Sequence, residues 1–277
     1  MARFKQFILL LLLSITTIAH PAPPVLNTDN SDSFEINKKT NIKKNISFLL
    51  SSALSGNHES QFDLGLAYAD GDGVEQSYKE AIKWYTLSAL QGNIKAQTNL
   101  GVMYFDGIGL ERNEVEAVRL FNLAAAKGNA NSQFNLGIAY TKGRGIGIDT
   151  TEALRWYRNA AMQGHTEALH SIGSIYYFGR GVEKDLLESA KWNCLSALQG
   201  NINSQYNIAR MYYLGEGVEV NKLKAYYWFD IAAGSGDAKA IISRDALAKS
   251  LDEVEIRVIS SSVACPTSLI NYVESDR

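Results

Sequence analysis

The fold is decided by residues 62–92, which read FDLGLAYADGDGVEQSYKEAIKWYTLSALQG. The same arrangement of glycines, tyrosines and small residues returns every 36 positions, giving five copies without insertion or deletion. The period is clearest in the glycines that separate the copies, which are Gly56, Gly92, Gly128, Gly164, Gly200 and Gly236. A fixed period of this length is typical of repeat proteins, in which each unit packs on its neighbours.

Further columns of residues keep this spacing. They comprise a glycine replaced once by alanine (Gly65, Gly101, Gly137, Gly173, Ala209), a tyrosine (Tyr68, Tyr104, Tyr140, Tyr176, Tyr212) and a large apolar residue (Trp84, Leu120, Trp156, Trp192, Trp228). Two closely spaced glycines, such as Gly71 and Gly73, follow the tyrosine in every copy. The agreement of all these columns excludes coincidence as the origin of the pattern.

Each copy is expected to form two helices joined by a short turn. In the first copy, apolar residues recur at helical spacing over about residues 60–69 and 78–91. Gly71 and Gly73 permit the positive φ angles of the turn, and Gly65 lets a neighbouring helix approach closely. No proline lies between Pro24 and Pro266 to interrupt a helix.

Stacking of these hairpins explains why the copies follow one another directly. A single helical hairpin leaves its apolar face uncovered, whereas stacked hairpins cover one another. The sequence therefore predicts an all-α fold, a right-handed α-solenoid of about five 36-residue helix-turn-helix repeats within residues 46–257. Residues 46–54 are expected to form a lone second helix before the first copy, with Phe48 in the position of Trp84. A long capping helix is expected over residues 237–256, followed by a C-terminal tail, residues 258–277, that is apolar enough to dock.

The start of the chain has the features of a secretory signal peptide. Arg3 and Lys5 precede a mostly apolar run from Phe7 to Ala19, so residues 1–19 are the predicted signal. An uncleaved membrane anchor is the alternative. Residues 20–45 are polar and rich in turn formers, which indicates a flexible linker. We therefore expect an exported protein, either periplasmic or secreted.

Composition and residue spacing exclude several function classes. The formal net charge of −2 argues against nucleic-acid binding, which usually needs a basic face. His165 and His170 differ by five positions, which is not the spacing that brings helix side chains together on one metal. We predict neither a metal site nor a cofactor.

The repeat resembles the Sel-one-like repeat (SLR), a relative of the tetratricopeptide repeat. The resemblance rests on Phe62 to Gly65, Tyr68, the pair Gly71 and Gly73, and Trp84, with Ala81, Ala89 and Gly92 completing the pattern. It implies a protein-interaction scaffold of the secreted bacterial type, whose members often act in envelope assembly or host contact. The expected partner is a protein or peptide, with cell-wall or membrane-protein contact also open.

The resemblance also implies a concave groove lined by the first helix of each repeat. The residues predicted to bind a partner there are Phe105, Phe134, His170, Tyr177, Phe178, Tyr206, Arg210 and Tyr213. Exposed aromatic residues with an arginine are typical interface anchors. The first two copies instead place Glu59, Asp63, Asp70 and Asp106 on this face, so that end of the groove is expected to be acidic. The alternative is that the aromatic residues simply pack between neighbouring first helices.

Catalysis finds no support in the sequence. Some secreted relatives are described as weak β-lactamases, but no serine here is followed three positions later by lysine, and no Lys-Thr-Gly triplet occurs. We therefore predict no catalytic residues. The alternative function is binding to cell-wall peptidoglycan, or a weak β-lactamase-like hydrolysis.

The two cysteines form a candidate disulfide. Cys194 lies in a second helix, at a position that is polar in the other copies and about opposite Trp192, so it is expected to be accessible. Cys265 lies in the tail, which reaches Cys194 if it folds back along the outer face. An accessible pair tends to oxidise in an exported protein. Reduced thiols and a link to another protein are the alternatives.

Overall fold

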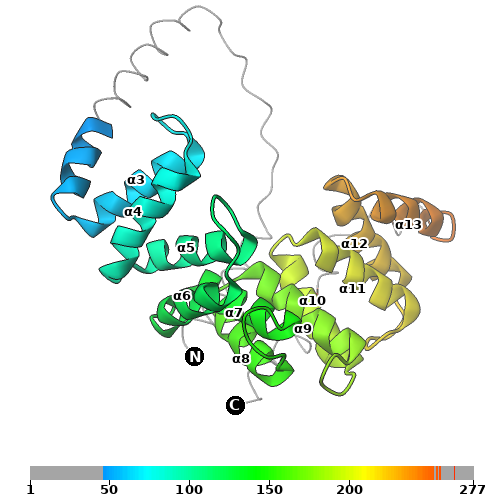
Figure 1. Cartoon of the computed structure of the whole chain (residues 1–277). Helices are drawn as coiled ribbons and strands as arrows, with labels where there is room; N and C mark the ends of the chain where they lie inside the picture. Colours follow the sequence, from blue (N-terminus) through cyan, green and yellow to red (C-terminus); the bar gives the residue numbers. More distant parts are fainter. Residues whose placement is uncertain (1–45, 253, 255, 257–264, 266–277) are drawn as a thin grey trace, which may run out of the picture. The chain divides into compact units, whose positions relative to one another are not determined.

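The computed structural model describes residues 46–252, 254, 256 and 265, and the regular secondary structure of this part of the chain is helical, without a strand. The fold is an all-α, solenoid-like repeat fold (Figure 1), as the sequence predicts. The predicted signal, the linker and all of the tail except Cys265 lie outside the described residues. None of the described helices is long and apolar enough to span a membrane.

The described residues divide between Ile148 and Asp149 into two compact units, here called the N-terminal and C-terminal units. The N-terminal unit contains a helix over residues 46–54 and then α3 (His58–Asp70), α4 (Tyr78–Leu90), α5 (Ile94–Asp106), α6 (Glu114–Ala126) and α7 (Ala130–Lys142). The C-terminal unit contains α8 (Thr150–Ala161), α9 (Thr166–Phe178), α10 (Leu186–Leu198), α11 (Ile202–Leu214), α12 (Lys222–Gly234) and α13 (Ala238–Ala248). The starts of α3, α5, α7, α9 and α11 are 36 residues apart, and α13 continues that series as a sixth first helix.

Polar caps and glycines fix where the helices begin and end. Every labelled helix except α9 begins after an Asn, Ser or Asp whose side chain accepts a backbone N–H; Asn57, for example, accepts from Ser60 at 2.8 Å. The first helices α3, α5, α7, α9 and α11 each end at a glycine in the left-handed conformation, such as Gly71 with a φ of 74°. The first glycine of each pair in the sequence therefore ends a helix, and the second lies in the turn that follows.

Close contact between the two helices of a repeat explains the glycine within the first helix. A Cβ on Gly65 would lie 2.6 Å from Cδ1 of the buried Tyr85, and one on Gly101 would lie 2.6 Å from Cε1 of Phe121. Real Cβ atoms do not come this close to a ring, so only glycine fits without a shift. The ring of the second helix thus packs directly on the backbone of the first.

A glutamine joins successive repeats. Gln61, Gln97 and Gln133 in the N-terminal unit donate to the carbonyl groups of Ala53, Ala89 and Ala125, at 3.1, 3.1 and 3.3 Å. In the C-terminal unit, Gln205 donates in the same way to Ala197. These glutamines are buried, so each bond satisfies a polar group that burial would otherwise penalise.

The lone second helix predicted over residues 46–54 is present. Phe48, which takes the position of Trp84 in that helix, is nevertheless 75% exposed. Trp84 packs with Ala53 and Leu49 of the helix over residues 46–54, which is the second helix one repeat earlier. The described residues include no still earlier helix that could cover Phe48 in the same way.

The prediction of one long last helix over residues 237–256 is wrong, because α13 already ends at Ala248. Asp252 then accepts the backbone N–H of Val254 at 2.7 Å, which is the bonding of a new helix start rather than of a continuing helix. Of the expected apolar stripe, Ala240 and Leu247 are buried, whereas Ile241 and Val254 are exposed.

Candidate functional site

Two neighbouring cavities lie along the first helices of the C-terminal unit. The first has a volume of about 450 Å³ and is lined mainly by α9 and α11, through Ser174, Tyr177, Phe178, Tyr206, Asn207, Arg210 and Met211, together with Asn193 and Lys239. The second has a volume of about 520 Å³ and lies between α11 and α13, lined by Tyr206, Arg210, Tyr213, Leu214, Lys222, Phe229, Ile242, Ser243, Ala246, Leu247 and Ser250. Tyr206 and Arg210 line both cavities. We call the two linings together the cationic-aromatic surface.

Arg210 is the central charge of this surface. Its guanidinium lies 3.3 Å from a carboxylate oxygen of Glu216 and 4.9 Å from the centre of the Tyr177 ring. Tyr177 in turn donates its hydroxyl to Glu216 at 2.9 Å. The three side chains hold one another in place between α9, α11 and the loop that follows α11, so Arg210 presents a fixed cation to both cavities.

The apolar groups of the surface are open to solvent. Phe178 is 58% exposed and its ring stacks edge-on at 5.0 Å from that of Tyr177. Tyr213 is 48% exposed, and Leu214 and Ile242 beside it are also exposed. Exposed large apolar residues around cavities of this size are typical of binding sites.

His170 lies at the same face but bonds within the protein. Its Nδ1 lies 2.8 Å from the hydroxyl of Ser204, which belongs to the next first helix, α11. Burial lowers the pKa of His170, partly opposed by Glu167, because the charged form of the ring is poorly solvated there. His170 therefore joins two first helices and lines neither cavity.

Two of the predicted groove residues belong to the N-terminal unit. Phe105 is buried, packed against Phe121 at 5.7 Å and covered by the guanidinium of Arg144 at 3.6 Å from the ring centre. Phe134 is partly buried on α7. Of the eight predicted residues, Tyr177, Phe178, Tyr206, Arg210 and Tyr213 line the two cavities.

The N-terminal unit has a smaller cavity of the opposite charge. About 200 Å³ in volume, it is lined by Asp63, Asp70 and Asp72 together with the apolar residues Ile46, Leu49, Leu66 and Ala67. Asp63 and Asp70 are two of the four acidic residues that the sequence places on this face. The two units therefore carry cavities with acidic and basic linings, respectively.

Asn193 is a residue of the site that sequence reasoning missed. At its place in the second helix the other repeats carry the aromatic residues Tyr85, Phe121, Tyr157 and Phe229. Asn193 donates to the backbone carbonyl and hydroxyl of Ser189, at 2.9 and 3.2 Å, and accepts from Asn207 at 3.2 Å. Because an amide is much smaller than a ring, the space remains open as the first cavity. Asn193 could have been found by comparing the residues at this position between the five repeats, because it alone is not aromatic.

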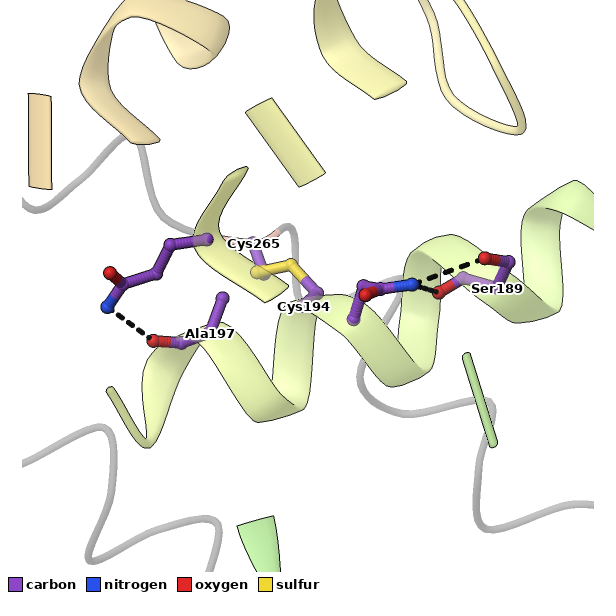
Figure 2. The surroundings of a disulfide bond; sticks show 6 residues. Ser189, Cys194, Ala197 and Cys265 are labelled. Atoms are coloured by element: carbon purple, nitrogen blue, oxygen red, sulfur yellow. Dashed lines mark hydrogen bonds between the residues drawn. A yellow bond between two sulfur atoms is a disulfide. The ribbon is translucent and has the colours of Figure 1, made fainter. Parts of the chain in front are cut away.

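A disulfide joins Cys194 of α10 to Cys265 across 71 residues of sequence (Figure 2). The expectation that Cys194 is accessible is wrong, because Cys194 is fully buried. Burial on α10 runs continuously from Ser189 to Ala197, so its outer face is covered as well as its inner face. Cys265, itself buried, lies against that outer face.

Paired helices that recur every 36 residues define a helical-repeat protein. A model of the Sel1 repeat matches residues 58–93, 94–129, 130–165, 166–201 and 202–237. The chain therefore belongs to the Sel1 repeat family, as its resemblance to the Sel-one-like repeat predicts. Sel1 repeat proteins generally mediate protein–protein interactions and are typically non-catalytic scaffolds.

Solved structures similar to this chain include two other SLR or Sel1 repeat proteins. A protective antigen of uropathogenic Escherichia coli with an SLR fold is 34% identical with a TM-score of 0.73, and the match covers 78% of this chain and 47% of the antigen. This chain thus spans about half the length of that antigen. A Sel1 repeat protein from Oxalobacter formigenes is 32% identical with a TM-score of 0.68, and the match covers 76% of this chain and 86% of that protein. A search of curated proteins finds no match.

Proposed function

We propose that this protein is a non-catalytic scaffold that binds a protein partner through the cationic-aromatic surface. The observation that carries the proposal is the pair of cavities that meet at Tyr206 and Arg210. Most of their lining residues come from α9, α11 and α13. Binding there needs no rearrangement of the helices, because the cavities are present without a ligand.

The side chains of the surface suit protein recognition. Tyrosine, arginine and phenylalanine carry much of the binding energy in protein interfaces, because each combines a large contact area with few rotatable bonds or several donors. Arg210 is already oriented by Glu216 and Tyr177, so little side-chain entropy is lost when it meets a partner.

A capture experiment tests the proposal. The protein is immobilised and exposed to an envelope extract, and the bound proteins are compared with those on a variant carrying Tyr206→Ala and Tyr213→Ala. A matched control carries Phe48→Ala and Tyr78→Ala, which remove exposed aromatic rings from the N-terminal unit. We expect a partner to be lost from the first variant and kept by the control. Equal recovery on both variants, or sedimentation of the protein with purified cell wall in place of protein capture, would contradict the proposal.

We also propose that the protein is exported to the periplasm or secreted. The charged and apolar pattern of residues 1–19 supports export, and the disulfide supports an oxidising compartment. N-terminal sequencing of the protein recovered from the envelope tests this: a new terminus near His20 is expected. An intact terminus with reduced cysteines would contradict export.

A further inference from the structure

The cationic-aromatic surface carries positive charge without matching acidic groups in its lining. Its charged lining residues are Arg210, Lys222 and Lys239, and the two linings include no Asp or Glu. Glu216 partly balances Arg210 from the side. Within the described part of the chain, Lys222 and Lys239 form no ion pair with a carboxylate. The surface therefore favours a ligand of negative charge.

The start of α12 adds to the positive charge of this surface, because it carries lysine where the second helices of the other repeats carry glutamate. The third residue of each earlier second helix is a glutamate that pairs with a basic residue three positions on, as Glu80 does with Lys83. In α12 that residue is Lys224, whose ammonium lies 5.2 Å from the ring centre of Tyr212. Lys222 and Lys224 thus stand at the positive end of the helix dipole, where an acidic residue is normally preferred.

The apolar parts of the two cavities indicate that the ligand carries apolar groups as well as negative charge. Replacement of an aromatic residue by Asn193 leaves the first cavity open beside Phe178 and Met211. The second cavity is floored by Phe229 and Leu247, with Ile242 at its edge. Spaces of this kind accept aromatic or aliphatic side chains, whose removal from water favours binding.

From these observations we infer that the partner presents an acidic segment whose apolar side chains enter the two cavities. This inference rests on the proposed function and adds the chemistry of the segment. Carboxylates of the segment meet Arg210, Lys222 and Lys239, and its aromatic or leucine side chains fill the space beside Asn193 and over Phe229. A polypeptide fits better than an anionic glycan, because sugar rings carry no aliphatic side chain for a cavity floored by Phe229 and Leu247.

Three labelled peptides of equal length test the inference by fluorescence anisotropy. All carry phenylalanine and leucine at the same positions, and the positions between them are Glu in the first peptide, Gln in the second and Lys in the third. We expect the Glu peptide to bind at least about tenfold more tightly than the Gln peptide, and the Lys peptide to bind most weakly. Raising the salt concentration is expected to reduce the difference.

Two variants locate the binding. The first carries Arg210→Gln, Lys222→Gln and Lys239→Gln, and its control carries Lys79→Gln, Lys95→Gln and Lys142→Gln, which remove the same charge from exposed sites of the N-terminal unit. The second carries Ser189→Ala and Asn193→Phe, which restores the alanine and aromatic pair of the other repeats and fills the first cavity without a change of charge. Each site variant is expected to weaken binding of the Glu peptide at least about tenfold, and the control less than about twofold.

The outcomes separate this inference from the proposed function. Equal binding of the Glu and Gln peptides, or full binding by either site variant, would overturn the acidic segment while leaving partner capture to stand on its own test. Binding of polygalacturonate at this surface without binding of the Glu peptide would identify an anionic glycan and overturn the inference. Loss of partner capture by the Tyr206 and Tyr213 variant would still support the proposed function in either case.

Discussion

The first and fourth repeats share one backbone plan and differ in what lies over the glycine of the first helix. In the first repeat the buried ring of Tyr85 covers Gly65 and fills the space between the helices. In the fourth repeat the amide of Asn193 covers Gly173, bonds to Ser189 and leaves a cavity of about 450 Å³. The helices keep the same length in both repeats. Variation at one column therefore changes the surface of the protein without changing its fold.

The outer faces of the same two repeats also differ. Lys83 in the first repeat pairs with Glu80, and its side chain is 58% exposed. Lys191, at the same position of the fourth repeat, pairs with Glu188 but is only 3% exposed. A surface pair contributes little to stability, whereas the enclosed pair must stay intact, because either charge left alone would be costly. The fourth repeat is thus enclosed where the first faces solvent.

The largest expected effect comes from exchanging the two residues over the glycines. Tyr85→Asn removes a buried ring, so we expect the free energy of unfolding to fall by about 3–5 kcal/mol. Asn193→Phe with Ser189→Ala fills an existing cavity and is expected to change it by less than about 2 kcal/mol. Urea denaturation measures both. Equal losses would show that the two columns are equally filled and would contradict the comparison.

Removal of the disulfide is expected to destabilise the C-terminal unit and to leave the N-terminal unit unchanged. Cys265→Ser removes a cross-link that closes a 71-residue separation, and the expected loss is about 2–4 kcal/mol, because the unfolded chain gains freedom. Hydrogen exchange of single helices is the measurement: protection of α10 and α11 is expected to fall while that of α4 stays. Reduction of the unmodified protein serves as the control and is expected to reproduce the effect. Unchanged exchange in α10 would contradict a stabilising role.

Gly65 tests how tightly the filled column is packed. Gly65→Ala places a Cβ 2.6 Å from Tyr85, so we expect a loss of about 1–3 kcal/mol from overpacking. Gly147→Ala is the matched control, because a Cβ there meets no atom within 4 Å. Thermal unfolding measures both variants. In a Tyr85→Ala background the Gly65 substitution is expected to cost less, and an equal cost in both backgrounds would show that the ring is not responsible.

The smallest expected effect is a pH dependence confined to the C-terminal unit. Burial lowers the pKa of both His165 and His170, while Glu167 opposes the shift. The unfolded chain then binds protons more readily than the folded one, so the stabilising contribution is complete above pH 6.5 and declines as the pH falls below that value. Exchange of α9 amides at pH 7.5 and 5.5 measures it, with corrections for intrinsic rates. A His165→Asn and His170→Gln variant is expected to lose the dependence, and its persistence would assign the effect to other groups.

Most of the fold can be predicted from the sequence alone, because the residues that pack together recur at the same positions in five copies. The spacing of Gly65 and its equivalents, and of Trp84 and its equivalents, can be read without any structure. The ends escape this reasoning, since Phe48 has no preceding repeat to cover it among the described residues. A periodic pattern describes interior contacts and loses its meaning where a neighbour is missing.

The site is only partly predictable for a different physical reason. Tyr177, Tyr206, Arg210 and Tyr213 could be found because they vary in columns of the first helices. Phe105 lies in such a column too, yet Arg144, in the turn of the next repeat, covers its ring. Whether a side chain is exposed depends on its neighbours in three dimensions, and the first cavity is lined in part by Asn193, which belongs to the opposite helix.

The disulfide has a mechanical consequence. It links α10 to Cys265, so α11, α12 and α13 lie inside a covalently closed loop. Tension pulling on the chain beyond Cys265 passes through the sulfur atoms directly to the fourth repeat and bypasses the fifth. The helices α11, α12 and α13, which carry most of the cationic-aromatic surface, are therefore shielded from a load on the C-terminus.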